Sequence, residues 1–223
     1  MLQVKNLCKS FMTGETVQEV LKNVNLTVKD GDFITIMGAS GGGKSTLLHL
    51  IALLDTPSSG EIYLDGRRVD CLKESYIEDL RGKNIGLIFQ NANLISSLNP
   101  LENLIIAMKD SKSKFKTKKK SAEQLLSRVG LSEKKDAKTS ALSGGEAQRV
   151  AVVRALVNNP SIILCDEPTG ALDSSNGEKV ISLLLELRKE TGCSLIIVTH
   201  DERIGVLGER RCFLKDGVLN EVD

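Results

Sequence analysis

The fold of this chain is decided by the stretch Gly38-Ala39-Ser40-Gly41-Gly42-Gly43-Lys44-Ser45-Thr46. Its first eight residues match the pattern GxxxxGK(S/T), in which glycines let the backbone wrap closely around phosphate groups. The apolar run before it, residues 33–37, predicts a buried strand, and residues 46–51 after it predict a helix. Strand, loop and helix therefore stand in the order that a phosphate-binding loop requires, which disfavours a glycine-rich turn that matches by chance.

Two side chains of this loop have predicted roles. Lys44 is expected to reach the β- and γ-phosphates of a nucleotide, and the Ser45 hydroxyl to take one position on a magnesium ion. Kinases, GTPases and ATPases all use such a loop, so alone it predicts only nucleotide binding.

Composition places the chain among folded globular proteins. It has 223 residues, of which 41% are hydrophobic and 26% charged, which favours one domain with room for an inserted subdomain. Thirty basic and 29 acidic side chains give a net charge of +1, so overall charge predicts neither a nucleic-acid partner nor an acidic substrate. Any basic partner surface must therefore be local.

No targeting or cross-linking feature stands out in the sequence. The longest nearly apolar stretch, residues 47–54, is well short of the roughly 18 residues that a membrane helix needs, and the N-terminus does not resemble a secretory signal. We therefore expect a cytosolic protein that does not cross a bilayer. The five cysteines form no CxxC pair, which predicts inert thiols rather than disulfides or a zinc site. They are Cys8, Cys71, Cys165, Cys193 and Cys212.

Alternating apolar runs and amphipathic stretches predict an α/β fold. Residues 33–37, 162–165 and 195–198 are expected to be buried parallel strands. Asp65-Gly66 and Asp216-Gly217 are hairpin signals, so antiparallel strands should flank the parallel core and make the sheet structure mixed. We expect these strands to flank the phosphate-loop core of a nucleotide-binding protein.

Helical patterns occupy two further regions. A helix is expected from Ser175, where Ser175 and Glu178 form a capping-box pattern, to Gly192. Strand signals are missing between about residues 95 and 141, where apolar residues at helical spacing end at Gly130. We therefore expect a single domain, residues 1–223, with a helical subdomain inserted over about residues 95–160.

Polar side chains follow the predicted strands and should gather at one edge of the sheet. Asp166 can hold magnesium through water, while Glu167 can polarise the water that attacks the γ-phosphate. His200 can contact the γ-phosphate or hold that water, and Gln90 can offer its amide oxygen to magnesium. Each of these roles has an alternative interpretation. The two acidic residues can simply form a turn before Pro168, the histidine can be structural, and the glutamine can be an ordinary surface residue.

A second glycine-rich helix start lies at Leu142-Ser143-Gly144-Gly145-Glu146. Ser143 and Glu146 form a capping box, so the motif could serve only to begin the helix that follows. Free N–H groups at a helix N-terminus also attract anions. Two anion sites for one nucleotide suggest a dimer that encloses the nucleotide between its subunits.

Together these motifs resemble those of the ATP-binding cassette (ABC) transporter ATPases, and the resemblance spans nearly the whole chain. The Walker A motif is residues 38–45, the Q-loop residue is Gln90, the signature is residues 142–146, the Walker B motif is residues 162–166 with Glu167 after it, the D-loop contains Asp173, and the switch histidine is His200. The resemblance implies an N-terminal antiparallel β-subdomain beside the phosphate-loop core, and a head-to-tail homodimer that closes over two ATP molecules. Each ATP would be held by Walker A of one subunit and the signature of the other.

The resemblance also assigns individual residues. Phe11 matches the position whose aromatic ring stacks on adenine, although a core phenylalanine is the alternative. The family often has tyrosine there, glutamine in place of Glu146 and alanine in place of Cys165, but none of these departures removes an essential catalytic group. We therefore expect an active, Mg²⁺-dependent ATPase. The expected metal ligands are Ser45, Gln90 and Asp166, and the expected catalytic side chains are Lys44, Glu167 and His200. The residues expected to contact ATP are Phe11, Gly38, Ala39, Ser40, Gly41, Gly42, Gly43, Lys44, Ser45, Thr46, Gln90, Ser143, Gly144, Gly145, Glu146 and Asp173.

Longer strings around the motifs, at residues 54–60, 142–151 and 166–173, look like one subgroup, the lipoprotein-release and macrolide-export type. It has relatives in antimicrobial-peptide export and cell division. The resemblance implies a separate membrane permease docked near residues 91–104, a place on the cytoplasmic face of the membrane, and export of a lipoprotein, macrolide or peptide. The alternative is a cassette that acts in cell-wall hydrolase control, in iron–sulfur assembly, or on DNA or ribosomes.

One stretch of the sequence has a biased composition, and it is rich in lysine. Residues 109–120 hold seven lysines and lie at the edge of the predicted helical subdomain. A solvated loop is the ordinary interpretation, and contact with anionic lipid headgroups is the alternative hypothesis. The lysines are Lys109, Lys112, Lys114, Lys116, Lys118, Lys119 and Lys120.

Overall fold

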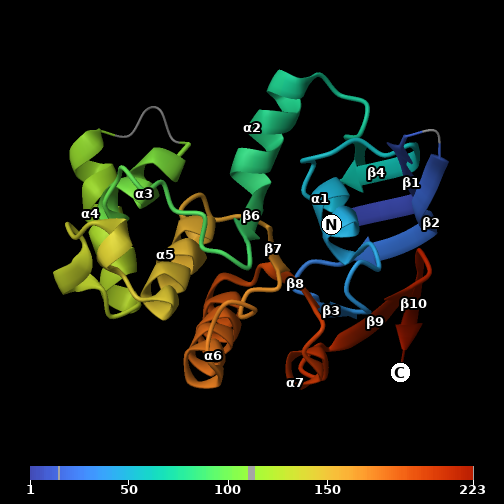
Figure 1. Ribbon diagram of the computed structural model, residues 1–223. Helices are drawn as coiled ribbons and strands as arrows, with labels where there is room; N and C mark the ends of the chain where they lie inside the picture. The colour runs from blue at the N-terminus through green and yellow to red at the C-terminus, as the bar shows by residue number, and fades with distance from the viewer. Residues whose placement is uncertain (15, 110–113, 223) are drawn as a thin grey trace.

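A computed structural model describes residues 1–14, 16–109 and 114–222 and shows two sheets and a group of helices (Figure 1). The larger sheet has the strand order β10-β9-β3-β8-β7-β6. Its strands are β3 (Phe33–Met37), β6 (Ile85–Ile88), β7 (Ile162–Asp166), β8 (Ser194–Thr199), β9 (Arg210–Lys215) and β10 (Val218–Val222). All neighbours pair in parallel except β9 and β10, which form the predicted hairpin at Asp216-Gly217. The α/β prediction is therefore confirmed.

The register of this sheet brings the carboxyl ends of its central strands level. Met37 pairs with Thr199 across β3 and β8, and Asp166 pairs with Val198 across β7 and β8. The loops that follow β3, β7 and β8 therefore start side by side. These loops carry the glycine-rich stretch, the two acidic residues and the histidine.

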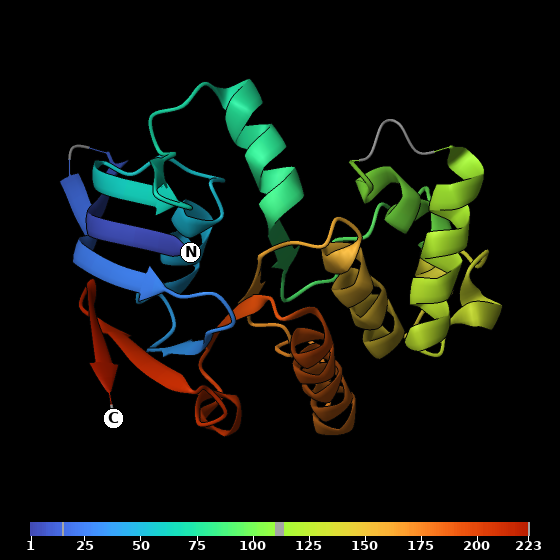
Figure 2. The same ribbon diagram turned by 180° about the vertical axis from the view of Figure 1, so that it is seen from behind.

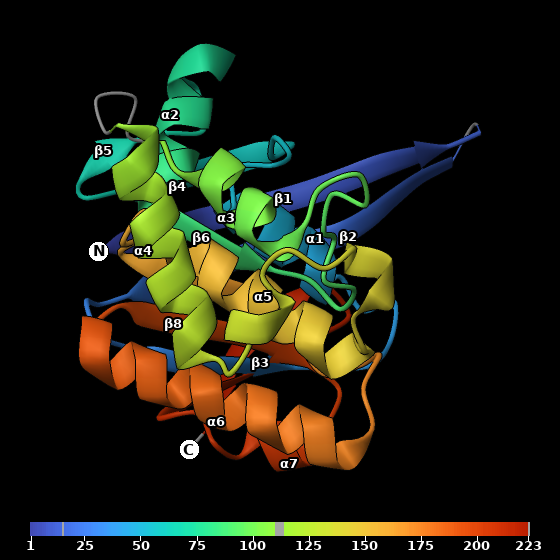
Figure 3. The ribbon, with the colours of Figure 1, turned by 90° about the vertical axis from the view of Figure 1, so that its left-hand side faces the viewer.

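The smaller sheet is antiparallel and confirms the predicted N-terminal β-subdomain. Its order is β2-β1-β4-β5, from β1 (Leu2–Thr13), β2 (Thr16–Val28), β4 (Ser59–Leu64) and β5 (Arg67–Arg68). The turn between β4 and β5 is the predicted Asp65-Gly66, with φ angles of 50° and 77° that suit a tight hairpin. The β1–β2 hairpin extends beyond the rest of the molecule (Figure 3).

Helix α1 (Lys44–Ile51) lies between the two sheets. Leu47, Leu48, Leu50 and Ile51 are all 0% exposed and share one apolar cluster with residues of both sheets. A helix that is apolar on nearly every side needs such complete burial. The glycine-rich loop that precedes α1 is thus anchored in the main core of the molecule.

Helix α6 (Ser174–Thr191) covers the opposite face of the larger sheet (Figure 3). Its predicted start was wrong: the N-cap is Asp173, whose carboxylate accepts a hydrogen bond of 3.0 Å from the Asn176 backbone N–H. Ser175 already lies in the first turn, because an aspartate two residues earlier is an equally good cap. The predicted end is confirmed, since Gly192 follows the helix with φ of 68°.

A separate group of helices lies at the far end of the molecule from the smaller sheet (Figure 2). Helices α3 (Pro100–Ala107), α4 (Phe115–Arg128) and α5 (Gly144–Leu156) share an apolar core of their own, centred on Leu104, Leu126 and Val150. We propose that this group is the subdomain expected over about residues 95–160, of which residues 110–113 lie outside the described part. Helix α2 (Glu74–Asn84) leads into β6, short 3₁₀ turns η1 (Ser132–Lys134) and η2 (Thr139–Ala141) precede α5, and α7 (Glu202–Gly205) follows β8.

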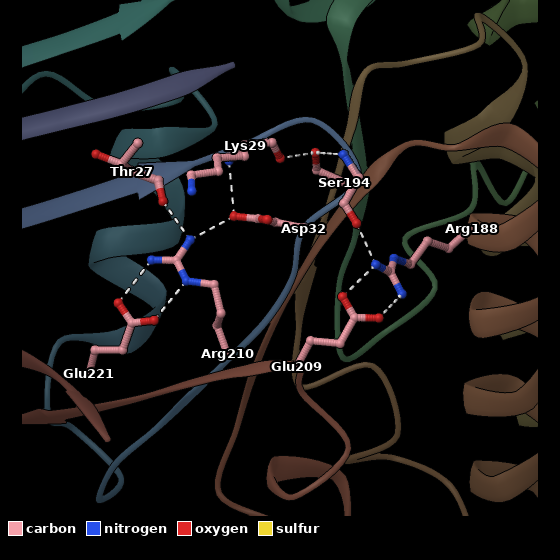
Figure 4. A network of polar contacts seen from close by, with 9 residues as sticks. Thr27, Lys29, Asp32, Arg188, Ser194, Glu209, Arg210 and Glu221 are labelled. Carbon is pink, nitrogen blue, oxygen red and sulfur yellow. Dashed lines mark hydrogen bonds and ion pairs between the residues drawn. The ribbon is translucent and has the colours of Figure 1, made fainter. Parts of the chain in front are cut away.

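An arginine network fixes the two sheets to each other (Figure 4). Arg210 of β9 donates to the Thr27 carbonyl of β2 (2.7 Å), to Asp32 (2.6 Å) and to both carboxylate oxygens of Glu221 (2.7 and 2.9 Å). The hydrogen bonds from Arg210 lower the pKa of Glu221. Nearby, Arg188 of α6 pairs with Glu209 at 2.8 Å. These bonds hold the start of β3 in place. Because β3 leads to the glycine-rich loop, they also help to position that loop.

Within the described ranges, none of the helices has both the length and the apolar character to span a lipid bilayer.

Candidate nucleotide-binding site

The loop between β3 and α1 has a shape that only glycines can form. Gly43 is the N-cap of α1 with φ of 92°, a left-handed conformation that side chains disfavour. A Cβ on Gly38 would lie 2.3 Å from the Leu214 carbonyl oxygen, and one on Gly42 would lie 3.0 Å from that of Ala39. No side chain of the described residues caps α1, so its first N–H groups are free to bind an anion.

Lys44 points its ammonium group into this loop. Its side chain is only 6% exposed, and Nζ donates hydrogen bonds of 2.9 Å to the carbonyls of Gly38 and Ala39. Nζ also lies 4.0 Å from Oε1 of Glu167. Because an ammonium group has three donors, one donor remains for a phosphate oxygen.

Ser45 and Asp166 meet across the sheet edge. The Ser45 hydroxyl at the start of α1 donates a 3.1 Å hydrogen bond to Oδ1 of Asp166 at the end of β7. A hydroxyl and a carboxylate are the oxygen donors that Mg²⁺ prefers. The structure therefore brings together two of the three predicted metal ligands.

Glu167 has a strained backbone and a tightly held side chain. Its φ is 48°, in the left-handed region, which costs a non-glycine residue roughly 1–2 kcal/mol. Its carboxylate is 15% exposed, accepts a 3.3 Å bond from the Thr199 hydroxyl, and lies 2.8 Å from Nδ1 of His200. A carboxylate only accepts, so Nδ1 carries the proton of this bond. Such strain tends to persist where function requires a fixed side-chain direction.

One cavity of about 440 Å³ collects most of these groups. It is lined by Val20, Ser40, Gly41, Gly43, Lys44, Ser45, Thr46, Gln90, Glu167 and His200. Gln90 follows β6 and packs against the turn after Glu167, because a Cβ on Gly170 would lie 2.8 Å from its Nε2. Val20, on β2, is a lining residue that no sequence motif indicated.

The signature residues 142–146 do not line this cavity. The predicted capping box is present: Glu146 N donates to the Ser143 hydroxyl (3.3 Å), and Ser143 N donates to the Glu146 carboxylate (2.8 Å), which lowers the pKa of Glu146. Gly145 packs against Asn176 of α6, where a Cβ would lie 2.8 Å from its amide oxygen. Ser143 is exposed, and it does not contact the cavity at the chain's own nucleotide loop.

Gly38, Ala39 and Gly42 of the glycine-rich loop are not among the lining residues, and the predicted contacts Phe11 and Asp173 also lie outside the cavity. Phe11 is 41% exposed on β1, so it is not a core phenylalanine, and the Lys9 ammonium group lies 4.9 Å from its ring centre. Asp173 caps α6 and accepts a hydrogen bond from the Asn176 backbone, which lowers its pKa. It lines a separate cavity of about 380 Å³ between α6 and α7.

Gln148 is a buried residue that sequence analysis missed. It is 1% exposed, and its Nε2 donates to the carbonyls of Phe89 (2.8 Å) and Pro168 (2.9 Å). These carbonyls stand directly before Gln90 and directly after Glu167. Gln148 therefore connects the helix of the signature to both strand ends of the site. A glutamine on an otherwise apolar helix face was the available signal.

Replacement of Gln148 by leucine is expected to lower the free energy of unfolding by about 2–3 kcal/mol, because leucine has similar size but leaves two buried carbonyls without donors. Chemical denaturation measures this loss, and Gln124→Leu on the exposed side of α4 is the matched control. Equal stability of the two variants would contradict the connecting role of Gln148.

The chain is similar to one protein family and to several known proteins. The family model described as "ABC transporter" matches residues 21–170. The ABC transporter ATP-binding protein MJ0796 of Methanocaldococcus jannaschii is 45% identical over 97% of this chain and 94% of that protein. The lipoprotein-releasing system ATP-binding protein LolD of Aquifex aeolicus is 44% identical over 92% of this chain and 91% of that protein.

The chain is also similar to part of a longer protein and to a solved structure. The macrolide export ATP-binding/permease protein MacB of Bdellovibrio bacteriovorus is 43% identical over 98% of this chain, which spans only 33% of MacB. The dimeric structure of MJ0796 in a post-hydrolysis state with ADP and Pi superposes with a TM-score of 0.93 and 42% identity, covering 100% of this chain and 98% of that one.

Proposed function

Because the chain belongs to the ABC transporter family, we propose that it is the ATP-hydrolysing subunit that drives a separate membrane permease. It is an ATP-binding subunit of the LolD and MacB type. The observation that carries the proposal is the meeting of Lys44, Asp166 and Glu167 at one sheet edge, while the signature helix start faces outward.

The geometry suggests how hydrolysis proceeds. The free N–H groups at the start of α1 and the Lys44 ammonium group bind the phosphates and neutralise their charge. Glu167 orients the attacking water and accepts its proton, and His200 holds the Glu167 carboxylate through Nδ1. In this scheme His200 acts on Glu167 directly, rather than only on the phosphate.

Mg²⁺ would be held by Ser45 and Asp166, with Gln90 lining the same cavity as Ser45. When bound, the ion supplies charge neutralisation between the β- and γ-phosphates. The described residues contain no group of three or more His, Cys, Asp or Glu side chains poised for a metal. Two oxygen donors suit Mg²⁺, which keeps most of its ligands as water and substrate phosphate.

A second copy of the chain would complete the site. Ser143 and Gly144 are exposed, and no signature residue lines the cavity of its own chain. The solved MJ0796 cassette is a dimer with ADP and Pi. We infer a head-to-tail homodimer in which the exposed start of α5 binds the γ-phosphate of the partner's ATP, with Phe11 placed against adenine.

The permease and cargo are inferred from the relatives. LolD is named for lipoprotein release and MacB, an ATP-binding/permease protein, for macrolide export, and this chain matches about a third of MacB. We propose a permease that docks near residues 91–104, a position at the cytoplasmic face of the membrane, and export of a lipoprotein, macrolide or peptide.

The dependence of turnover on protein concentration tests the shared site. ATP hydrolysis per molecule is expected to rise with protein concentration until dimers form, because one chain alone lacks the signature contact. Lys44→Ala measures contaminating activity in the same preparation. A constant rate per molecule at dilutions where ultracentrifugation shows only monomers would contradict the proposal. Purification of the tagged chain from membranes should recover the permease.

A further inference from the structure

We propose that the N-terminal end of α4 binds the anionic headgroups of a lipid bilayer. The surface consists of Lys114, Phe115, Lys116, Lys119 and Lys120, and we call it the basic surface. All five side chains are exposed, and Phe115 is 68% exposed. Lys112 belongs to the same lysine run but lies outside the described residues and takes no part in the argument.

The basic surface has a high density of positive charge. Five of the seven residues from Lys114 to Lys120 are lysines, and none is acidic. Among the described residues, no carboxylate lies within ion-pair distance of Lys116, Lys119 or Lys120. The nearest acidic residue of α4, Glu123, instead pairs with Lys135 at 2.8 Å.

This charge opposes the stability of the helix that carries it. The N-terminal end of a helix is the positive end of its dipole, and α4 has no acidic residue in its first turn and no side-chain cap from the residues that the structure describes. Lys116 and Lys120 are four residues apart and repel each other along the helix. Residues that weaken their own element are a mark of a functional surface, so the charge calls for a partner outside the chain.

The type of charge and its surroundings favour lipid. The cations are all lysines, which act as point charges and suit scattered headgroup phosphates, whereas arginine predominates where planar groups of nucleic acids are recognised. The exposed Phe115 ring adds the apolar contact that peripheral proteins insert between headgroups.

The position of the basic surface fits the same partner. Helix α4, which carries it, belongs to the helical group on the side of the molecule away from the smaller sheet (Figure 1). Helix α4 is also the next helix after α3, which overlaps the proposed permease-docking segment. Only this last point rests on the proposed function, because a permease brings the chain close to a bilayer.

Sedimentation with vesicles tests the proposal on the isolated full chain. Each lysine near an anionic surface contributes about fivefold to partitioning. Lys116→Gln, Lys119→Gln and Lys120→Gln together should therefore lower binding to phosphatidylglycerol–phosphatidylcholine vesicles on the order of a hundredfold. The matched control replaces three exposed lysines of α6 and β9: Lys179→Gln, Lys189→Gln and Lys215→Gln. It carries the same net charge and should bind almost as well as the original chain.

Two further measurements show whether charge and the exposed ring both contribute to lipid binding. Binding should weaken strongly at 0.5 M salt, since a Debye length of a few ångströms screens exposed charges, and pure phosphatidylcholine vesicles should bind far less. Phe115→Ala should reduce the binding that remains at high salt. Both triple variants should unfold at the same denaturant concentration as the original chain, which shows that they fold by a measurement that does not depend on the proposed function.

Three results would overturn the proposal. They are equal binding to the two vesicle types, equal loss of binding in the triple variant and its matched control, and tight binding of a labelled single-stranded oligonucleotide that depends on the same three lysines and exceeds vesicle binding. The last result would assign the basic surface to nucleic acid instead.

Discussion

Replacement of Glu167 by glutamine should lower ATP hydrolysis by about a hundredfold to ten-thousandfold while leaving ATP binding intact, the range that a lost general base produces. Glutamine keeps the size of the side chain and its hydrogen bond with Thr199. It loses the charge that orients water beside Lys44 and the acceptor oxygen for the His200 proton. Binding should survive because the phosphates are held by the loop after β3.

The trapped state supplies a second readout. With hydrolysis slowed, ATP should hold two chains together, and size-exclusion chromatography with ATP should show a dimer that the original chain forms only transiently. Glu186→Gln, at an exposed position on α6, is the matched control and should change neither quantity. Undiminished turnover in the Glu167 variant would reject Glu167 as the base.

The strands whose residues are buried on both faces of the larger sheet could be predicted from the sequence. Residues of β3, β7 and β8 are nearly all buried, so their apolar runs stand out from the polar turns on either side. The long β1–β2 pair gave no such signal. Its register shifts after Val4, Leu7 and Lys9 break the alternation of apolar and polar residues that identifies a half-buried strand.

The site was predictable as a set of side chains but not as a set of contacts. Spacing within one segment indicated Lys44, Ser45 and Asp166, because each motif is local in sequence. The bond between Glu167 and His200 joins residues 33 positions apart, and Gln148 reaches carbonyls 59 and 20 positions away. Such contacts depend on how strands and helices pack, which single-sequence patterns do not encode. The same holds for Val20 in the cavity wall.

The second large effect is expected from Ser143→Arg. This variant should abolish hydrolysis, with turnover at least about a hundredfold lower, as when a group that contacts the reacting phosphate is removed. ATP affinity of the monomer should stay unchanged, because Ser143 is exposed and does not line the cavity of its own chain. The lost N-cap should cost about 1 kcal/mol of stability, which is too little to unfold the chain.

A matched control and a mixing experiment show whether Ser143 acts across the interface. Ser140→Arg adds the same bulk and charge at an exposed position three residues earlier, and it should keep most of the activity. Ser143→Arg and Lys44→Ala are each expected to be inactive alone. Mixed in equal amounts, they should recover about a quarter of the original rate, because random pairing places half of the chains in mixed dimers that have one complete site of two. If the signature served its own chain, neither variant would hold a complete site, and the mixture would stay inactive.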